Sequence, residues 1–230
     1  LFLVGIEARG AVRWVDVFGI RIQFSEIIKP FFVIFMASYL TSNDSRSLGK
    51  FLKAILLILP IFFLILIQTD LGNAMIYIIV SFFMLLFYRF PIKYFFGVLG
   101  IFLVLLPLMF NLLAPYQKQR VLTFMNVASD PLSSSYNIVQ SLISIGSGGV
   151  IGKGFGEGTQ SILKFLPERH TDFIFASISE NLGFLGSSLL IGIYLYLLIR
   201  IYKITSFVND EFSNLGLMGL YFLLLVHIFF

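Results

Sequence analysis

Cysteine is absent from this chain of 230 residues, and charged residues are scarce. Without cysteine, the chain has no disulfide framework, no thiol nucleophile and no cysteine-based metal site. Its two histidines are too few for a protein metal cage. Asp, Glu, Lys and Arg together make up 12% of the residues, about half of the roughly 25% that soluble domains carry. The chain therefore lacks the polar surface that a water-soluble body of this size requires.

Apolar residues take the place of the missing charge: 58% of the chain is hydrophobic, and 28 residues are phenylalanine. A helix needs about 20 mostly apolar residues to cross the hydrocarbon core of a bilayer. The sequence therefore predicts an all-α, polytopic integral membrane helix bundle. Its expected spans are Ser25–Leu40, Phe51–Gln68, Ala74–Tyr88, Tyr94–Phe110, Gly183–Tyr202 and Leu215–Phe230. The net charge of +4 is modest and dispersed, so it does not indicate a nucleic-acid partner.

The distribution of Lys and Arg predicts the sidedness of the bundle. If the spans alternate in direction, three of the connections lie on the same side of the membrane, and all three are basic. They hold Arg46, Lys50 and Lys53; Arg89 and Lys93; and Arg200 and Lys203. The positive-inside rule makes that side cytoplasmic and places residues 111–171 in one long extracytoplasmic loop. Because the chain starts without Met and stops inside an apolar run, we expect residues 1–230 to be one membrane domain, incomplete at both ends.

The stretch LPERHTDFIF places a cluster of ionisable residues at the start of an apolar segment. In a helix that starts near Thr171, Asp172 shares one stripe with Ala176, Ser179 and Gly183, at i, i+4, i+7 and i+11. A stripe of small or polar residues faces a packed interior or a cavity rather than lipid. Two interpretations of Asp172 stay open. It is either a residue favoured by the dipole of the helix N-terminus or a general base at the boundary of membrane and water.

Three further acidic residues are candidates for chemistry. Glu26 lies three residues before Lys29 on a helix that enters the membrane, so the two side chains can pair. Ionisable residues inside membrane helices are functional suspects by default, and a structural salt bridge is the alternative. Asp70 stands close to Gly72 in a short turn, which turn formation alone would explain. Glu180 lies deeper in an apolar helix and needs a partner, which the sequence does not name.

Glycines cluster in the run SIGSGGVIGKGFGEG, residues 144–158. A phosphate-binding Walker loop ending at Gly152 and Lys153 would need Gly in place of Ser147, and Ser or Thr in place of Gly154. The run therefore does not fit a phosphate loop. We expect a re-entrant or tightly packed loop, in which glycine allows the close approach of two backbones.

Six sequence blocks resemble the motifs of one protein family, and they occur in the same order along the chain. They are GAVRW, QFSEIIK, QTDLGNA, YQKQRV, DPLSSSYNIVQSLISIGSGGVIGKGFGEGTQ and LPERHTDFIFASISENLG. The sequence resembles the SEDS family (shape, elongation, division and sporulation) of peptidoglycan polymerases, and its blocks look more like the RodA branch than the FtsW branch. The resemblance implies a bundle of ten membrane helices, of which this chain would begin just before the fourth and end within the ninth.

The resemblance also implies roles for particular residues. Asp172 matches the family's catalytic aspartate, and Glu26 and Lys29 match the pair that the family places beside a central cavity. Asp70 matches another motif aspartate, and His170 and Glu180 are expected to support the same site. Three positions depart from the family pattern: Phe24, Thr69 and Asn181. None of the three removes an ionisable group that is assigned to chemistry, but Asn181 puts in doubt any role of a second acidic residue after Glu180.

The implied reaction is glycosyl transfer that polymerises lipid II, a lipid-linked disaccharide-pentapeptide, during cell-wall synthesis and cell-shape maintenance. Asp172 would take the proton of the attacking sugar hydroxyl. The leaving pyrophosphate needs positive charge from basic side chains or from a divalent metal ion such as Mg²⁺ or Mn²⁺, and no organic cofactor is expected. The candidate basic residues are Arg13, Lys118, Arg120 and Arg169.

The family implies a partner and a cellular place. The partner is a class B penicillin-binding protein, a transpeptidase that crosslinks the new strand, and the place is the bacterial plasma membrane. The rival hypothesis is a flippase or transporter of lipid-linked precursors, because buried ionisable residues also line transport pathways. A transporter places its site near the bilayer midplane between repeats, whereas this sequence shows no convincing repeat and concentrates its polar residues at the outer surface.

Overall fold

A computed structural model describes most of the chain. The described residues are 6–8, 11–17, 20–43, 45–68, 70–112, 118, 136–154, 157–158 and 173–229. The chain divides into two compact units, each of which we describe by itself. Unit 1 combines Leu1–Gly100 with Leu197–Phe230, and unit 2 is Ile101–Tyr196.

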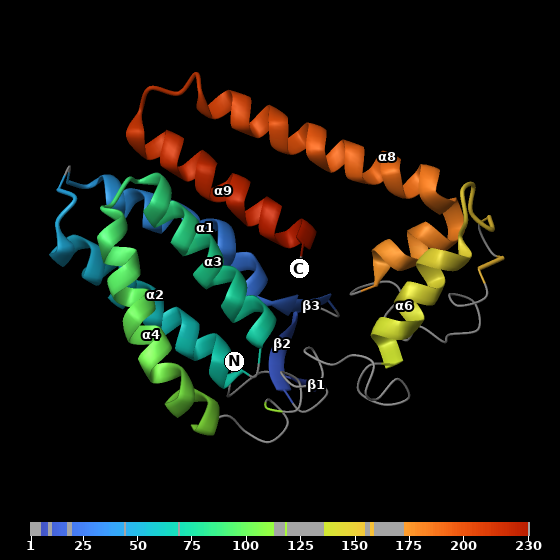
Figure 1. Cartoon of the computed structure of the whole chain (residues 1–230), viewed down its shortest axis with the longest axis horizontal. Helices are drawn as coiled ribbons and strands as arrows, with labels where there is room; N and C mark the ends of the chain where they lie inside the picture. Colours follow the sequence, from blue (N-terminus) through green and yellow to red (C-terminus); the bar gives the residue numbers. More distant parts are fainter. Residues whose placement is uncertain are drawn as a thin grey trace. The chain divides into compact units, whose positions relative to one another are not determined.

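Seven helices form the described helical part, and their bounds follow. They are α1 (Phe24–Thr41), α2 (Leu48–Ile67), α3 (Leu71–Phe87), α4 (Ile92–Leu112), α6 (Tyr136–Ser147), α8 (Ile174–Thr205) and α9 (Glu211–Phe229) (Figure 1). Each of the six predicted spans falls on one of these helices. By length and composition, α1, α2, α8 and α9 are long and apolar enough to cross a membrane, and α3 and the first part of α4 are shorter apolar helices. The predicted membrane helix bundle is confirmed.

A small antiparallel sheet, which the sequence analysis did not predict, precedes α1. Its strands are β1 (Ile6–Ala8), β2 (Ala11–Val17) and β3 (Ile20–Gln23), in that spatial order. β-Branched residues are frequent in β2 and β3, as strands favour. Gln23 pairs with Trp14 in the sheet and is also the N-cap residue of α1, with an extended backbone. The sheet therefore fixes where the chain enters α1 (Figure 1).

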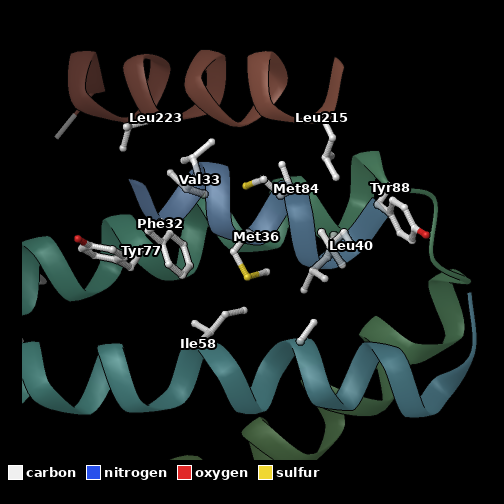
Figure 2. Packing of buried hydrophobic residues seen from close by; sticks show 14 of the residues in the cluster. Phe32, Val33, Met36, Leu40, Ile58, Tyr77, Met84, Tyr88, Leu215 and Leu223 are labelled. Atoms are coloured by element: carbon white, nitrogen blue, oxygen red, sulfur yellow. The ribbon is translucent and has the colours of Figure 1, made fainter. Parts of the chain in front are cut away.

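The core of unit 1 lies where α1, α3 and α9 pack on one another and α2 packs on α3 (Figure 2). Its buried side chains include Val33, Met36, Leu40, Tyr77, Met84, Leu215 and Leu223. Gly219 lets α9 come close, because a Cβ there would stand 2.5 Å from Cγ1 of Val33 and 2.9 Å from Sδ of Met84. Outward-facing side chains such as Phe31 and Leu56 are 65% and 63% exposed, as suits a surface that lipid covers.

Lys50 connects three helices by hydrogen bonds at the end of unit 1 where α1 ends. Its buried ammonium donates to the backbone carbonyls of Leu40 and Asn43 and to the hydroxyl of Tyr88, at 2.9 Å in the last case. The Tyr88 hydroxyl in turn donates to the Asn43 carbonyl, at 2.9 Å. A cation near the C-terminus of a helix satisfies its unpaired carbonyls. Lys50 therefore caps α1 from α2, with α3 as the third support.

Candidate functional site

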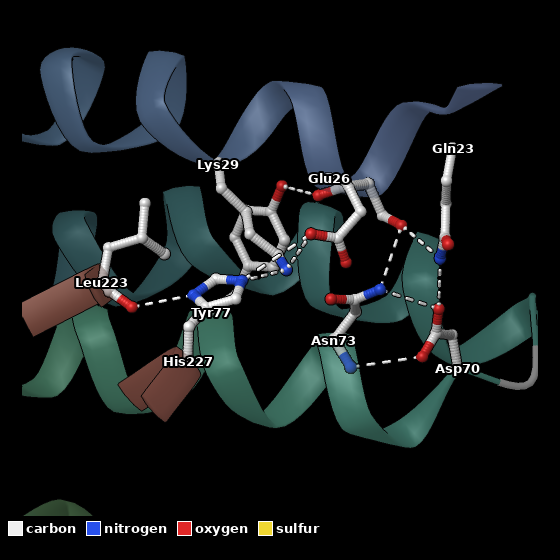
Figure 3. Close-up of polar contacts among 9 residues, drawn as sticks. Gln23, Glu26, Lys29, Asp70, Asn73, Tyr77, Leu223 and His227 are labelled. Atoms are coloured by element: carbon white, nitrogen blue, oxygen red, sulfur yellow. Dashed lines mark hydrogen bonds and ion pairs between the residues drawn. The ribbon is translucent and has the colours of Figure 1, made fainter. Parts of the chain in front are cut away.

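A polar cluster joins the start of α1, the start of α3 and the last turns of α9 within unit 1 (Figure 3). Its members share a position among otherwise apolar helices. They are Gln23, Ser25, Glu26, Lys29, Asp70, Asn73, Tyr77 and His227. Three of the residues that the sequence singled out, Glu26, Lys29 and Asp70, therefore lie in one cluster.

Lys29 is the charged centre of this cluster. Its side chain is 3% exposed, and its Nζ donates to Oε2 of Glu26 at 2.7 Å. The same Nζ lies 2.9 Å from Nε2 of His227, a residue 198 positions later in the chain. Nε2 of His227 is also 3.7 Å from the Glu26 carboxylate. The predicted pairing of Glu26 with Lys29 is thus confirmed, and a histidine completes it.

The tautomer of His227 follows from its two neighbours. Nδ1 lies 2.8 Å from the backbone carbonyl of Leu223, which can only accept a hydrogen bond, so Nδ1 carries the proton. In the neutral ring Nε2 then offers a lone pair, which accepts a hydrogen bond from the ammonium of Lys29. The buried ammonium therefore has two acceptors, a carboxylate on its own helix and an imidazole on α9. This arrangement meets the need of a buried charge for paired and hydrogen-bonded surroundings.

Asp70 anchors the second half of the cluster. It is the N-cap residue of α3, and its Oδ1 accepts the backbone N–H of Asn73 at 3.2 Å. Its Oδ2 accepts from the side-chain amides of Gln23, at 2.7 Å, and Asn73, at 2.9 Å. The Tyr77 hydroxyl donates to the Ser25 carbonyl at 2.9 Å. Asp70 is therefore more than a turn residue, because it connects the entrance of α1 to the first turn of α3.

Sequence reasoning missed five members of the cluster: Gln23, Ser25, Asn73, Tyr77 and His227. Asp70, Asn73 and Tyr77 stand at i, i+3 and i+7 of one helix face, so the helical period of 3.6 could have identified the latter two. Gln23 lies inside a family block but was not given a role. No local signal pointed to His227, whose distance in sequence from Lys29 hides the contact.

His227 provides a test of the cluster. Replacing it with leucine removes one of the two acceptors of the buried Lys29 ammonium. We expect His227→Leu to lower the stability of the full-length protein by about 1–3 kcal/mol, the cost of leaving a buried polar group unpaired. His227→Gln is the matched control, since its amide oxygen can still accept from Lys29, and it should retain most of the stability. Thermal unfolding in detergent measures both variants, and equal melting temperatures for the two would contradict the assignment.

Unit 2 contains the second candidate site, built around Glu180. Its side chain is fully buried in α8, and Oε1 lies 3.6 Å from Nζ of Lys153 in the glycine-rich loop. The structure thus supplies the partner that the sequence could not name. Gly158 packs against the same carboxylate, because a Cβ there would stand 2.9 Å from its Cδ. Glu180 and the glycine-rich loop therefore belong to one packed site.

The glycine-rich loop packs against a break in α8. The helix is kinked at Gly183, whose φ of 66° and ψ of −162° are not helical. Four backbone hydrogen bonds join the loop to the helix across this kink. They run from Phe184 N to Gly149 O, Leu185 N to Val150 O, Lys153 N to Glu180 O and Gly154 N to Asn181 O, at 2.9–3.1 Å. The predicted tightly packed loop is confirmed, since Cβ atoms at Gly148 and Gly152 would collide with the backbone of α8.

The stripe predicted from the spacing after Thr171 is buried where the structure describes it. Ala176 and Ser179 are 3% and 2% exposed, and Gly183 lies against the loop. Asp172, His170, Arg169 and Arg120 lie outside the described residues. For Arg13 the structure describes only the backbone in β2, and Lys118 is a partly buried residue. The roles of these residues stay predictions.

Among the residues that the structure describes, no group of three or more His, Cys, Asp or Glu side chains could hold a metal ion. The described part of either unit therefore offers no cluster of such side chains that could bind the expected Mg²⁺ or Mn²⁺. Asp172 and His170 lie outside that part.

Comparison with known proteins identifies the family. The model of the family FTSW_RODA_SPOVE, described as "Cell cycle protein", matches residues 1–230. The chain belongs to this family. It is 36% identical over 240 residues to "Peptidoglycan glycosyltransferase MrdB" of Escherichia coli K12, covering 100% of this chain and 64% of the relative. It is 33% identical over 226 residues to "Probable peptidoglycan glycosyltransferase FtsW" of Wigglesworthia glossinidia brevipalpis, covering 93% and 57%. The chain thus spans less than two thirds of the length of these relatives.

Solved structures agree with this fold. A chain from "Structural coordination of polymerization and crosslinking by a peptidoglycan synthase complex" matches with a TM-score of 0.77 and 28% identity, over 96% of this chain and 61% of that one. The rod shape determining protein RodA of Thermus thermophilus matches with a TM-score of 0.60, over 96% of this chain and 56% of that one. At 24% identity the second likeness concerns the fold alone. Both support the membrane helix bundle seen here.

Proposed function

We propose that the full-length protein is a peptidoglycan glycosyltransferase that polymerises lipid II for cell-wall synthesis and cell-shape maintenance. The observation that carries the proposal is the buried Lys29, held by Glu26 and His227 among membrane helices. A charge at such a place is costly and usually functional. The relatives named peptidoglycan glycosyltransferase, matched over the whole of this chain, support the same activity.

The proposed chemistry is a single displacement at an anomeric carbon. The 4-hydroxyl of the incoming lipid II sugar attacks the anomeric carbon of the growing glycan, from the face opposite its lipid pyrophosphate. A glycosidic bond forms, the bond to the pyrophosphate breaks, and Asp172 takes the hydroxyl proton. Basic side chains stabilise the negative charge of the leaving pyrophosphate, with Arg13, Lys118, Arg120 and Arg169 as the candidates.

The role of the described cluster is to hold α1, α3 and α9 of unit 1 in one geometry. Gln23 and Asp70 connect the start of α1 to α3, and Lys29 with His227 connects α1 to α9. Hydrogen-bonded and ion-paired side chains of this kind restrict the positions of the helices that carry them. Fixed positions for reacting groups lower the barrier, because orientation is already established when substrate arrives.

The remaining features of the proposal concern surroundings and partners. We propose that residues 1–230 belong to one membrane domain and that residues 111–171 lie on the extracytoplasmic side of the bacterial plasma membrane, where lipid II would be polymerised. A class B penicillin-binding protein is the proposed partner, which the likeness to a chain of a peptidoglycan synthase complex supports. A divalent ion is an additional proposal, and no step is derived through it.

Lys29 gives the test of this function. Lys29→Met keeps the apolar stem of the side chain but removes the ammonium that binds Glu26 and His227. We expect glycan synthesis from lipid II by the full-length protein to fall by about 10²-fold, the loss that a small misplacement caused away from the reacting groups produces. Gel analysis of the glycan products gives the measurement.

Lys53→Met is the matched control, because Lys53 is exposed on α2 outside the cluster. It should polymerise lipid II at the wild-type rate. If Lys29→Met keeps the wild-type melting temperature and also the wild-type rate, the cluster is structural and the proposal loses its main support.

A further inference from the structure

A cavity opens at the end of unit 1 where Lys50 caps α1. Its volume is about 240 Å³, and residues of three separate connections line it. Arg46 comes from the connection of α1 to α2, and Tyr88 and Arg89 follow α3. Asn209 lies just before α9, and Glu211 and Asn214 belong to its first turns. None of these residues takes part in the cluster around Lys29, so the proposed reaction does not use the cavity.

The charge of the lining suits a monoanion. Two guanidinium groups and one carboxylate, those of Arg46, Arg89 and Glu211, leave a net charge of +1. Nη2 of Arg46 is 3.9 Å from Oε1 of Glu211, which is too long for a hydrogen bond, and both side chains are about half exposed. The planar fork of a guanidinium matches the oxygens of a phosphate. A nearby carboxylate, Asp210, is turned to its own helix, where it accepts from Ser213 N and Oγ at 2.8 and 2.6 Å.

The backbone of Arg89 is the second observation. Its φ of 65° lies in the left-handed region, and among the described residues no other residue besides glycine has a positive φ. The residue directly follows Tyr88, the C-cap of α3, a position where glycine is usual because a side chain is disfavoured there. A residue held in such a conformation is a reason to look for function. The arginine places its charge at the cavity, which glycine could not do.

Asn214 is the third observation. Its amide nitrogen donates to the carbonyls of Thr205, at 2.9 Å, and Val208, at 3.2 Å, which fixes the orientation of the amide. Its Oδ1 is buried and finds no donor among the described residues. Buried acceptors are almost always paired. A ligand that carries hydroxyl groups beside a phosphate would supply that donor.

We propose that this cavity binds the phosphate-bearing headgroup of a monoanionic phospholipid, with phosphatidylglycerol as the chemical type. Arg46 and Arg89 bind the phosphodiester, and Asn214 and Glu211 accept hydrogen bonds from the glycerol hydroxyls. The surroundings suit a lipid: Phe87, which also lines the cavity, and Phe207, in the connection of α8 to α9, are 39% and 83% exposed. Basic pockets at the ends of membrane helices recognise anionic headgroups in this way.

The decisive variant is Arg89→Gly. Glycine suits the left-handed backbone, so the fold should keep its melting temperature, while the guanidinium is lost. Native mass spectrometry of the full-length protein in detergent would count bound phosphatidylglycerol against a phosphocholine lipid. We expect wild type to prefer phosphatidylglycerol, and Arg46→Gln combined with Arg89→Gly to weaken its binding about 10–30-fold. Arg200→Gln, an exposed arginine of α8 that does not line the cavity, should leave binding unchanged.

Results of two kinds would overturn the inference. The first is equal binding of the two lipids by wild type, or unchanged phosphatidylglycerol binding in the double variant. The second is displacement of the lipid by inorganic phosphate or glycerophosphoglycerol at matched concentrations, which would assign the cavity to a water-soluble phosphate. Neither readout depends on glycan synthesis, so the experiment tests lipid binding independently of the proposed enzyme activity.

Discussion

Asp172→Asn is expected to reduce glycan synthesis by the full-length protein by about 10²–10⁴-fold, the contribution of a positioned general base. Asparagine has the shape of aspartate, but its amide cannot take the proton of the attacking hydroxyl. Asp172 stands two residues before α8, whose first residue is Ile174. Because the substitution preserves shape at the beginning of a helix where asparagine is also favourable, the fold should persist.

Lipid II polymerisation, with the cognate transpeptidase present, measures the effect of this substitution. Glu157→Gln is the matched control, because it neutralises an exposed carboxylate in the same long connection. The control should polymerise at the wild-type rate. Substantial synthesis by Asp172→Asn would move the base to another residue without changing the class of enzyme.

Gly183→Ala is expected to disrupt unit 2. The φ of 66° and ψ of −162° at Gly183 belong to a region that only glycine adopts without strain. An added Cβ would also collide with the backbone nitrogen of Gly152 and the carbonyl carbons of Val150 and Ile151. The strain and the overpacking together should cost roughly 3 kcal/mol or more, because rigid backbone cannot move aside cheaply.

Gly192→Ala is the control on the same helix. Beyond the backbone of the helix itself, nothing lies within 4 Å of a Cβ built there, so alanine should be tolerated and slightly favoured in the helix. Thermal unfolding and protease sensitivity of the two full-length variants give the comparison. If Gly183→Ala has the same melting temperature as the wild type, the kink and its four hydrogen bonds to the loop do not stabilise unit 2.

Composition and spacing predicted the features that depend on nearby residues. The six membrane spans follow from runs of apolar residues, and the pairing of Glu26 with Lys29 follows from their spacing on one helix. The burial of Ala176 and Ser179 follows from helical periodicity. Each of these depends on residues a few positions apart, where the helix itself sets the geometry.

Contacts between distant segments could not be predicted in the same way. His227 reaches Lys29 only because α9 packs on α1, and Lys153 reaches Glu180 only because the glycine-rich loop lies on α8. The kink at Gly183 was likewise hidden, since a glycine inside an apolar run looks like an ordinary helical residue. The glycine-rich loop explains why the kink is required. The carbonyls of the loop accept hydrogen bonds from the N–H groups of Phe184 and Leu185, which follow the kink.

The three-stranded sheet before α1 has a different explanation. Its strands have three to seven residues, too short for alternation of polar and apolar residues to stand out in a chain dominated by apolar runs. The sheet matters because β3 delivers Gln23 to Asp70. An element that was not predicted thus positions one end of the predicted site.

The measurement that tests the central claim most directly uses the full-length wild-type protein reconstituted in vesicles that contain labelled lipid II. Glycan polymer and transfer of lipid II between leaflets are recorded in the same sample. A glycosyltransferase produces glycan chains, with no transfer beyond that of protein-free vesicles. Transfer of lipid II without any polymer, in the presence of the cognate transpeptidase, would contradict the account and assign the buried Lys29 cluster to a flippase.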